Sequence, residues 1–212
     1  MEQLVKYTQI DIANWKRSHH YNFFKNFEQP FFGVCTEINC TAAYNYCKAY
    51  RQSFLMYYLH KSLLAANQVK EFKYRMKGGG VVEYHQISGS ITVLRNDETF
   101  GFAYFDYTTN FGEFARQARQ VIDAEKLAAG EELKFGPDSV IHYSILPDIK
   151  FTSMQHAQML TANDSVPKVV FGKLDFRDGQ AWLPVSVHVH HALCDGFHVG
   201  QFIKAYQLLM EV

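Results

Sequence analysis

The sequence predicts an α+β fold in which helices cover a mixed β-sheet. Apolar residues alternate in more segments than recur at helical spacing, so strands should outnumber helices. These strands do not alternate strictly with the helices, which points to a mixed-sheet layer fold. The 212 residues are 48% hydrophobic. Because no repeat, low-complexity tract or Pro/Gly/Ser linker interrupts them, residues 1–212 are expected to form a single domain.

The first half of the chain is expected to mix strands and helices. Asp11 can cap a first helix over residues 14–24. Apolar and aromatic residues at helical spacing predict another helix over 52–67. Three consecutive glycines at 78–80 separate two β-like runs and predict a hairpin. The remaining elements expected here are strands over 5–10, 31–40, 72–76 and 81–84, and a short helix over 41–47.

The second half of the chain is expected to hold most of the sheet. Apolar residues at helical spacing mark an amphipathic helix around 111–122. A last helix is expected around 199–209, because its apolar residues also fall on one face. Further strands are predicted over 90–94, 100–105, 139–146, 168–174 and 181–190.

Composition excludes several classes of partner. The formal net charge is zero and no long basic block exists, so nucleic acid is not an expected partner. No apolar signal region opens the chain and no run approaches the ~20 apolar residues of a membrane span, so no membrane association is expected. The cysteines, at 35, 40, 47 and 194, have no Cys-x-x-Cys spacing, which favours a reducing cytoplasm over a disulfide framework. The aromatic share of 16% is consistent with a ring-lined pocket, a subunit interface or large core clusters.

The most specific segment is residues 190–196, which read His-His-Ala-Leu-Cys-Asp-Gly. In a strand alternate residues share a face, so His191 continues the apolar face of Val187 and Val189, whereas His190 shares the opposite face with His188. A shielded imidazole tends to stay neutral, and the neutral form accepts a proton. His191 is therefore the better candidate for a general base.

Three interpretations of this segment compete on the residues alone. The first is a core histidine with a satisfied hydrogen bond and an Asp that caps the following helix. The second is a metal site built on His188 and His190, which is disfavoured because no Cys or carboxylate ligand lies at close spacing. The third is general-base catalysis by His191. Cys194 is expected to be a small buried residue and not a nucleophile.

A resemblance decides between these interpretations. The segment HHALCDGFHVGQFI resembles the signature of chloramphenicol acetyltransferases. Residues 11–20, the block 144–147 with 151–153, and residues 183–187 resemble other segments of that family. A bare His-His-x-x-x-Asp-Gly also occurs in dihydrolipoamide acyltransferases and peptide-synthetase condensation domains. The flanking blocks and the chain length select the antibiotic-modifying family.

The resemblance implies a fold and a reaction. The fold would be the two-layer sandwich of coenzyme A-dependent acyltransferases, assembled as a trimer. The reaction would move the acetyl group of acetyl-CoA, a co-substrate, to a primary hydroxyl of chloramphenicol and so inactivate the antibiotic. Both substrates would be bound together, and His191 would take the proton from the hydroxyl. No metal is implied.

The resemblance also implies roles for other residues. Ser144 would donate a hydrogen bond to the oxyanion. Asp195 would pair with Arg17 in a structural role, near the base. In the trimer, His191 would come from one chain, while Ser144 and most of the drug pocket would come from its neighbour. The aromatic residues that would line this pocket are Phe24, Phe100 and Phe135.

Two departures from the family pattern keep alternatives open. Asp148 stands where familiar members carry Trp, and Val170 stands where some carry Thr. These changes motivate a second hypothesis, an O-acetyltransferase with another small hydroxylated acceptor. A third hypothesis is a non-catalytic protein that only sequesters the drug. Release of free coenzyme A from acetyl-CoA would exclude sequestration.

Overall fold

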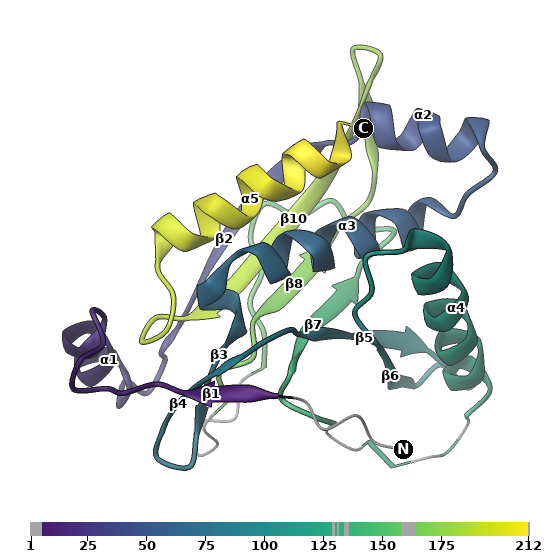
Figure 1. Ribbon diagram of the computed structural model, residues 1–212. Helices are drawn as coiled ribbons and strands as arrows, with labels where there is room; N and C mark the ends of the chain where they lie inside the picture. Colours follow the sequence, from purple (N-terminus) through teal and green to yellow (C-terminus); the bar gives the residue numbers. More distant parts are fainter. Residues whose placement is uncertain (1–5, 129, 131, 134–135, 158–163, 212) are drawn as a thin grey trace.

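A mixed sheet forms the centre of the computed structural model, which describes residues 6–128, 130, 132–133, 136–157 and 164–211. This seven-stranded sheet has the order β2-β10-β8-β7-β5-β6, and β9 pairs with β10 (Figure 1). β7 runs parallel to β5 and to β8, and the other pairs are antiparallel. Its strands are β2 (Phe31–Asn39), β5 (Ser88–Leu94), β6 (Phe100–Phe105), β7 (Val140–Ile145), β8 (Lys168–Phe171), β9 (Asp175–Arg177) and β10 (Gln180–His190).

A smaller sheet lies beside the large one. It has three strands in the order β1-β4-β3. The predicted hairpin is its centre, because β3 and β4 are antiparallel neighbours and Gly78 and Gly79 turn the chain with positive φ. The strands are β1 (Tyr7–Gln9), β3 (Tyr74–Lys77) and β4 (Gly80–Tyr84).

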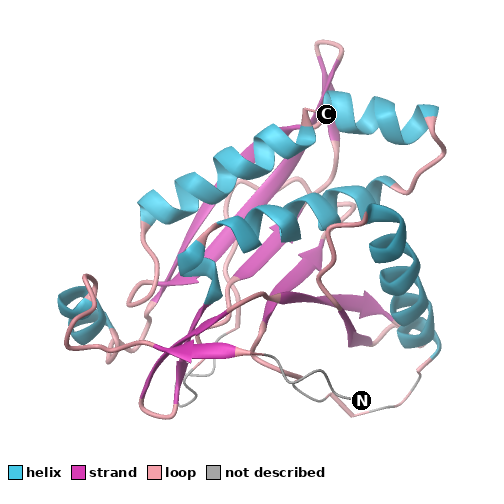
Figure 2. Cartoon of the chain, in the orientation of Figure 1, coloured by secondary structure: helices cyan, strands magenta, loops and turns pink. Residues whose placement is uncertain are grey.

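Helices cover one face of the large sheet, as Figures 1 and 2 show. They pack on alternate strand residues such as Val185, Val187 and Val189, which are at most 1% exposed and belong to the main core. The prediction that these valines share the apolar face of their strand is confirmed. The helices are α2 (Thr41–Ala49), α3 (Phe54–Gln68), α4 (Phe111–Leu127) and α5 (Gly196–Met210).

The opposite face of the sheet is polar near its middle. Ser186 and His188 are buried there together with Lys168, which is paired in register with His188 on the neighbouring strand. Part of the cover comes from the segment after β7, since His188 donates a hydrogen bond from Nε2 to the Met154 carbonyl at 3.1 Å. On this face opens a cavity of about 460 Å³, which is described below.

The N-terminal helix is shorter than predicted. α1 spans Ser18–Phe24, and residues 12–17 form turns. Asp11 does not cap this helix: its carboxylate accepts hydrogen bonds from the Ala13 amide at 3.1 Å and the Asn14 side chain at 2.7 Å. These local bonds stabilise a turn, which competes with helix formation at this point.

Two further differences concern short elements. The strand predicted over 72–76 begins at Tyr74, because Lys70–Lys73 form a 3-10 turn. β9 was not predicted; it forms a hairpin with β10 through Asp178 and Gly179, both with positive φ. Among the described residues no helix is both long enough and apolar enough to cross a membrane.

Candidate active site

His191 lies where β10 ends and the chain turns toward α5. β10 ends at His190, so His191 is the first residue of the turn and not the last of the strand. Its amide donates a hydrogen bond to the Pro30 carbonyl at 2.8 Å. Its ring stacks on Phe24, with centroids 4.0 Å apart and planes 8° apart, and Phe32 contacts it at 4.7 Å. The ring is therefore held by aromatic contacts on an anchored backbone.

The two motif histidines differ in their hydrogen bonds. Nδ1 of His190 accepts the Ala192 amide at 3.2 Å, and burial lowers the pKa of His190 to about 4. His191 is half-buried, and in the described part of the chain neither of its ring nitrogens has a hydrogen-bond partner. Because Nδ1 of His191 is buried, Nε2 is the ring nitrogen that remains available to a substrate.

Arg17 and Asp195 meet beside this histidine. Arg17 Nη1 lies 2.6 Å from Asp195 Oδ2, and its Nη2 donates to the His191 carbonyl at 3.3 Å. Burial alone would raise the pKa of Asp195, but the Arg17 hydrogen bond and nearby positive charge outweigh it and lower that pKa. Asp195 also caps α5 by accepting the Phe197 amide at 3.0 Å. The pair thus links α1, the turn at His191 and the start of α5.

Two other chemistries considered for this segment were a thiol nucleophile and a metal site. Burial raises the pKa of the Cys194 thiol, so this side chain stays protonated at neutral pH. Within the ranges that the structure describes, no group of three or more His, Cys, Asp or Glu side chains is arranged to hold a metal ion.

Ser144 lies on the opposite, polar face of the sheet and lines a cavity of about 460 Å³. It is half-buried on β7 and points away from the helices, since its neighbour Tyr143 belongs to the core. Thr92 donates a hydrogen bond to Ser144 Oγ at 3.3 Å. The Ser144 proton therefore remains free to be donated to a ligand.

The cavity has an aromatic wall and a polar wall. Phe100, Phe102 and Tyr104 on β6 line one side, and His142, His156 and Lys168 line the other. The sequence analysis named Phe100 as a pocket residue, but it did not predict the polar side chains of His142, His156 and Lys168. Strand alternation could have revealed His142, because it lies two residues before Ser144 on the same face.

The other two aromatic residues predicted to line the drug pocket are Phe24 and Phe135. Phe24 does not line this cavity; it stacks on His191. Phe135 lies outside the described residues.

Ser144 and His191 lie far apart within one chain. The register aligns Ser144 with Val170, and Val170 with Ser186. His191, just beyond the end of β10, lies five residues after Ser186, or roughly 16 Å along the strand direction, and two strand spacings add roughly 10 Å across the sheet. Their separation is thus roughly 19 Å, and one chain cannot bring both side chains to the same reacting atom.

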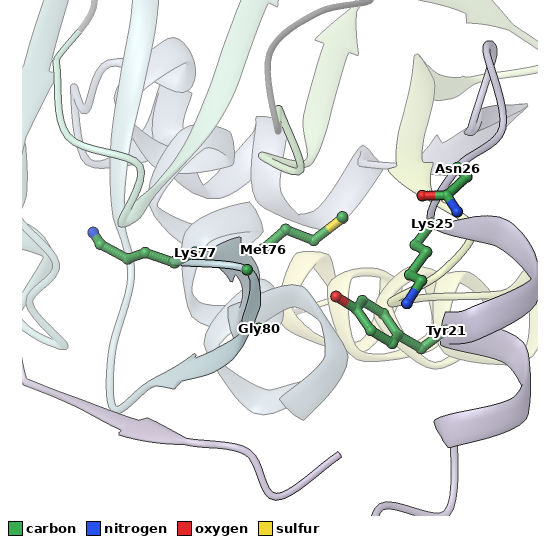
Figure 3. A pocket seen from close by; sticks show the side chains of 7 residues that line it. Tyr21, Lys25, Asn26, Met76, Lys77 and Gly80 are labelled. Carbon is green, nitrogen blue, oxygen red and sulfur yellow. The ribbon is translucent and has the colours of Figure 1, made fainter. Parts of the chain in front are cut away.

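A second, smaller cavity of about 220 Å³ lies between α1 and the β3–β4 hairpin. Figure 3 shows Tyr21 of α1, and Lys25 directly after α1, beside Met76, whereas Lys77 extends away from them. Lys77 Nζ binds Tyr84 at 2.9 Å and Asp138 at 3.2 Å, and Lys25 Nζ binds Asn22 at 2.9 Å. Because neither His191 nor Ser144 lines this cavity, the larger one is the better candidate for substrate.

Comparison with known proteins gives one consistent result. A family model described as "Chloramphenicol acetyltransferase" matches residues 5–207. A chloramphenicol acetyltransferase of Klebsiella sp is 26% identical over 211 residues, which cover 97% of this chain and 94% of the relative. A solved chloramphenicol acetyltransferase structure superposes with a TM-score of 0.84 and 30% identity, covering 97% of this chain and 100% of that one.

A more distant structure shares the fold alone. The probable dihydrolipoamide acetyltransferase of Listeria monocytogenes has a TM-score of 0.66 at 14% identity, and the match covers 97% of this chain and 94% of that one.

Proposed function

The chain belongs to the chloramphenicol acetyltransferase family, and from this premise we propose that it transfers the acetyl group of acetyl-CoA to a hydroxyl of chloramphenicol. The observation that carries the proposal is the imidazole of His191. Phe24 and the Arg17–Asp195 pair hold it in place, and neither ring nitrogen is used within the described part of the chain.

In the proposed reaction His191 takes the proton from the acceptor hydroxyl as its oxygen attacks the acetyl carbonyl. Acetyl-CoA, the co-substrate, supplies the activated acetyl thioester. Ser144 donates its proton in a hydrogen bond to the carbonyl oxygen as this oxygen gains negative charge. His191 then returns the proton to the departing sulfur, so free coenzyme A is the second product. A correctly placed base contributes about 10²–10⁴-fold in rate, and holding both substrates together in a ternary complex contributes more.

The separation of the two residues supports a site shared between chains. Because roughly 19 Å divides Ser144 from His191 in one chain, we propose a homotrimer in which His191 of one copy faces the Ser144 cavity of the next. The exposed aromatic residues near His191, Phe23 and Phe27, are 65% and 45% exposed in a single chain and would be covered in such an assembly.

Two further assignments are part of the proposal. We take residues 1–212 as one domain, because the family match extends from residue 5 to residue 207. The cytoplasmic location remains a prediction, for which the free cysteines at 35, 40, 47 and 194 are the support.

A thiol-release assay tests the function. Acetyl-CoA is mixed with the protein in the presence and absence of chloramphenicol, and free coenzyme A is measured together with the acetylated drug. Wild type should release coenzyme A only with the drug, and His191→Ala should lower turnover at least about 10²-fold while its melting temperature stays unchanged. Near-normal turnover in His191→Ala would contradict general-base catalysis by His191. Drug binding without release of coenzyme A would indicate sequestration.

A further inference from the structure

The polar wall of the Ser144 cavity is unusual for a site expected to bind a ring-bearing drug. His142 and Ser144 are alternate residues of β7, so they lie on the same face about 7 Å apart along the strand. Ser90, on the neighbouring strand β5, is paired in register with His142, and its hydroxyl lies 3.2 Å from His142 Nδ1. A ligand whose reacting end lies at Ser144 can therefore reach these groups with its other end.

His156 completes the wall from the segment that follows β7. Its ring packs edge-on against His188, with centroids 4.7 Å apart. His188 and His142 are both paired in register with Lys168, so His156 lies over the same row of the sheet as His142. Nε2 of His156 is buried, and among the described residues it has no hydrogen-bond partner. Because His156 lines the cavity, a ligand group there lies beside its ring.

The charges of the wall select the kind of group that fits. Lys168 Nζ already binds Asp164 at 2.7 Å and the Val166 carbonyl at 3.2 Å, so its charge is compensated. Burial lowers the pKa of His142 and of His156 to about 4, so both imidazoles are uncharged at neutral pH. A neutral imidazole offers one donor and one acceptor nitrogen. The wall thus offers hydrogen bonds and no unpaired charge, which suits a neutral polar group better than a carboxylate.

We propose that His142 and His156 are specificity-determining residues that hydrogen-bond a neutral polar group of the acceptor, about 7 Å from the hydroxyl that is acetylated. The acceptor then lies between two unlike walls. Its apolar part contacts Phe100 and Phe102, and its polar end meets the histidines. This inference rests on the proposed function, because it assumes that the acceptor occupies the Ser144 cavity.

Binding of chloramphenicol, a neutral molecule with hydroxyl, amide and nitro groups, tests the inference. Calorimetry gives its Kd for wild type, His156→Leu and His156→Gln, and steady-state kinetics give KM for acetyl-CoA. His156→Leu removes the hydrogen bond and should weaken drug binding about tenfold, which corresponds to about 1.4 kcal/mol. His156→Gln retains a donor and an acceptor and should stay close to wild type, with KM for acetyl-CoA unchanged in both variants.

His85→Leu serves as the matched control, because His85 is an exposed histidine outside the cavity. It should leave drug binding unchanged. Equal or tighter binding of chloramphenicol by His156→Leu would overturn the inference, as would a loss that appears in KM for acetyl-CoA instead. A different result would contradict the proposed function itself: wild-type protein that binds the drug but releases no coenzyme A.

Discussion

At the scale of single residues, the candidate base is fixed through its ring face and its backbone. Phe24 stacks on the imidazole of His191, and Arg17 bonds the carbonyl of the same residue. Neither contact uses a ring nitrogen. A general base needs a nitrogen within hydrogen-bond reach of the substrate proton, so this arrangement restrains the ring without occupying its reactive atoms.

The role of Ser144 can be tested by removing its hydroxyl. Ser144→Ala should cost about 2.7–4 kcal/mol of transition-state stabilisation, so kcat should fall about 10²–10³-fold, with a smaller change in KM. The reason is that Thr92 donates to Ser144 and leaves the Ser144 proton for the acetyl oxygen. Steady-state kinetics with acetyl-CoA and chloramphenicol measure both constants. A defect confined to KM would contradict the oxyanion role.

Removal of Arg17 should lower both stability and activity. Arg17→Ala breaks a charged hydrogen bond at 2.6 Å in which the arginine side chain is 7% exposed. The loss should lower the free energy of unfolding by about 2 kcal/mol and loosen the backbone of His191. Urea unfolding and thiol release check the two effects, with the exposed neighbour variant Lys16→Ala as control. Lost activity at an unchanged melting temperature would show that the pair acts on catalysis alone.

The same pair predicts a pH dependence. Burial opposes ionisation of Asp195, but the bond from Arg17 outweighs it, and the pKa of Asp195 lies below its ordinary value. The unfolded chain therefore binds this proton first, at about pH 3.9. The stabilisation is fully present above that pH and is lost as the pH falls through the lower folded pKa. Wild type and Arg17→Ala should thus differ at pH 7, and the difference should shrink as the pH falls below about 3.9.

At the scale of elements, β10 links the core to the site, because one of its faces is apolar and the other carries polar side chains. Its valines build the helix-covered core, and Ser186, His188 and His190 face the polar side. Antiparallel pairing with β2 places Gly33 directly opposite His188. The His188 ring lies over this glycine, which explains why no side chain is present there.

A methyl group at position 33 should therefore strain the β2–β10 pair. A Cβ on Gly33 would lie 2.3 Å from His188 Nε2, so Gly33→Ala should lower the free energy of unfolding by about 1–3 kcal/mol. Gly200→Ala is the matched control, because a Cβ there meets nothing within 4 Å and alanine favours the α5 helix. Chemical denaturation of both variants, of His188→Ala and of the double variant Gly33→Ala/His188→Ala measures the coupling. Additive effects in the double variant would argue against a clash.

At the scale of the whole molecule, the candidate site divides into two halves. His191 with Phe24 lies at one end of β10, whereas Ser144 lines the cavity on the polar face, roughly 19 Å away. In the proposed function, a complete site therefore takes two copies of the chain, each contributing a different half.

Complementation between two inactive variants tests this arrangement. In a mixed trimer of His191→Ala and Ser144→Ala chains, one interface would join an intact His191 to an intact Ser144. Equimolar chains that are unfolded and refolded together should recover about a quarter of wild-type turnover, if they assemble at random into trimers. Each variant refolded alone is the control. If the mixture regains no activity although mixed oligomers form, both residues act within one chain.

Much of this protein is determined by local sequence pattern. The alternating valines of β10, the helical spacing in α3, α4 and α5, and the glycine hairpin were all predicted, because each depends on neighbours in the chain. The family resemblance was also carried by short segments, and the comparisons confirm it. Two predictions failed for local reasons. Asp11 was expected to cap the first helix, but its carboxylate stabilises a turn instead. β9 was not predicted, because its three residues are too few to give a periodic signal.

Tertiary structure decided what the side chains meet. The sequence could place Arg17 and Asp195 together only through the resemblance, yet folding brings them to 2.6 Å across 178 residues. The stacking of Phe24 on His191, and the gathering of His142 and His156 in one cavity, depend on register across several strands and on a loop that packs over them. Periodicity fixes the face on which a side chain lies, whereas the partner on that face is set by long-range pairing that no local pattern encodes.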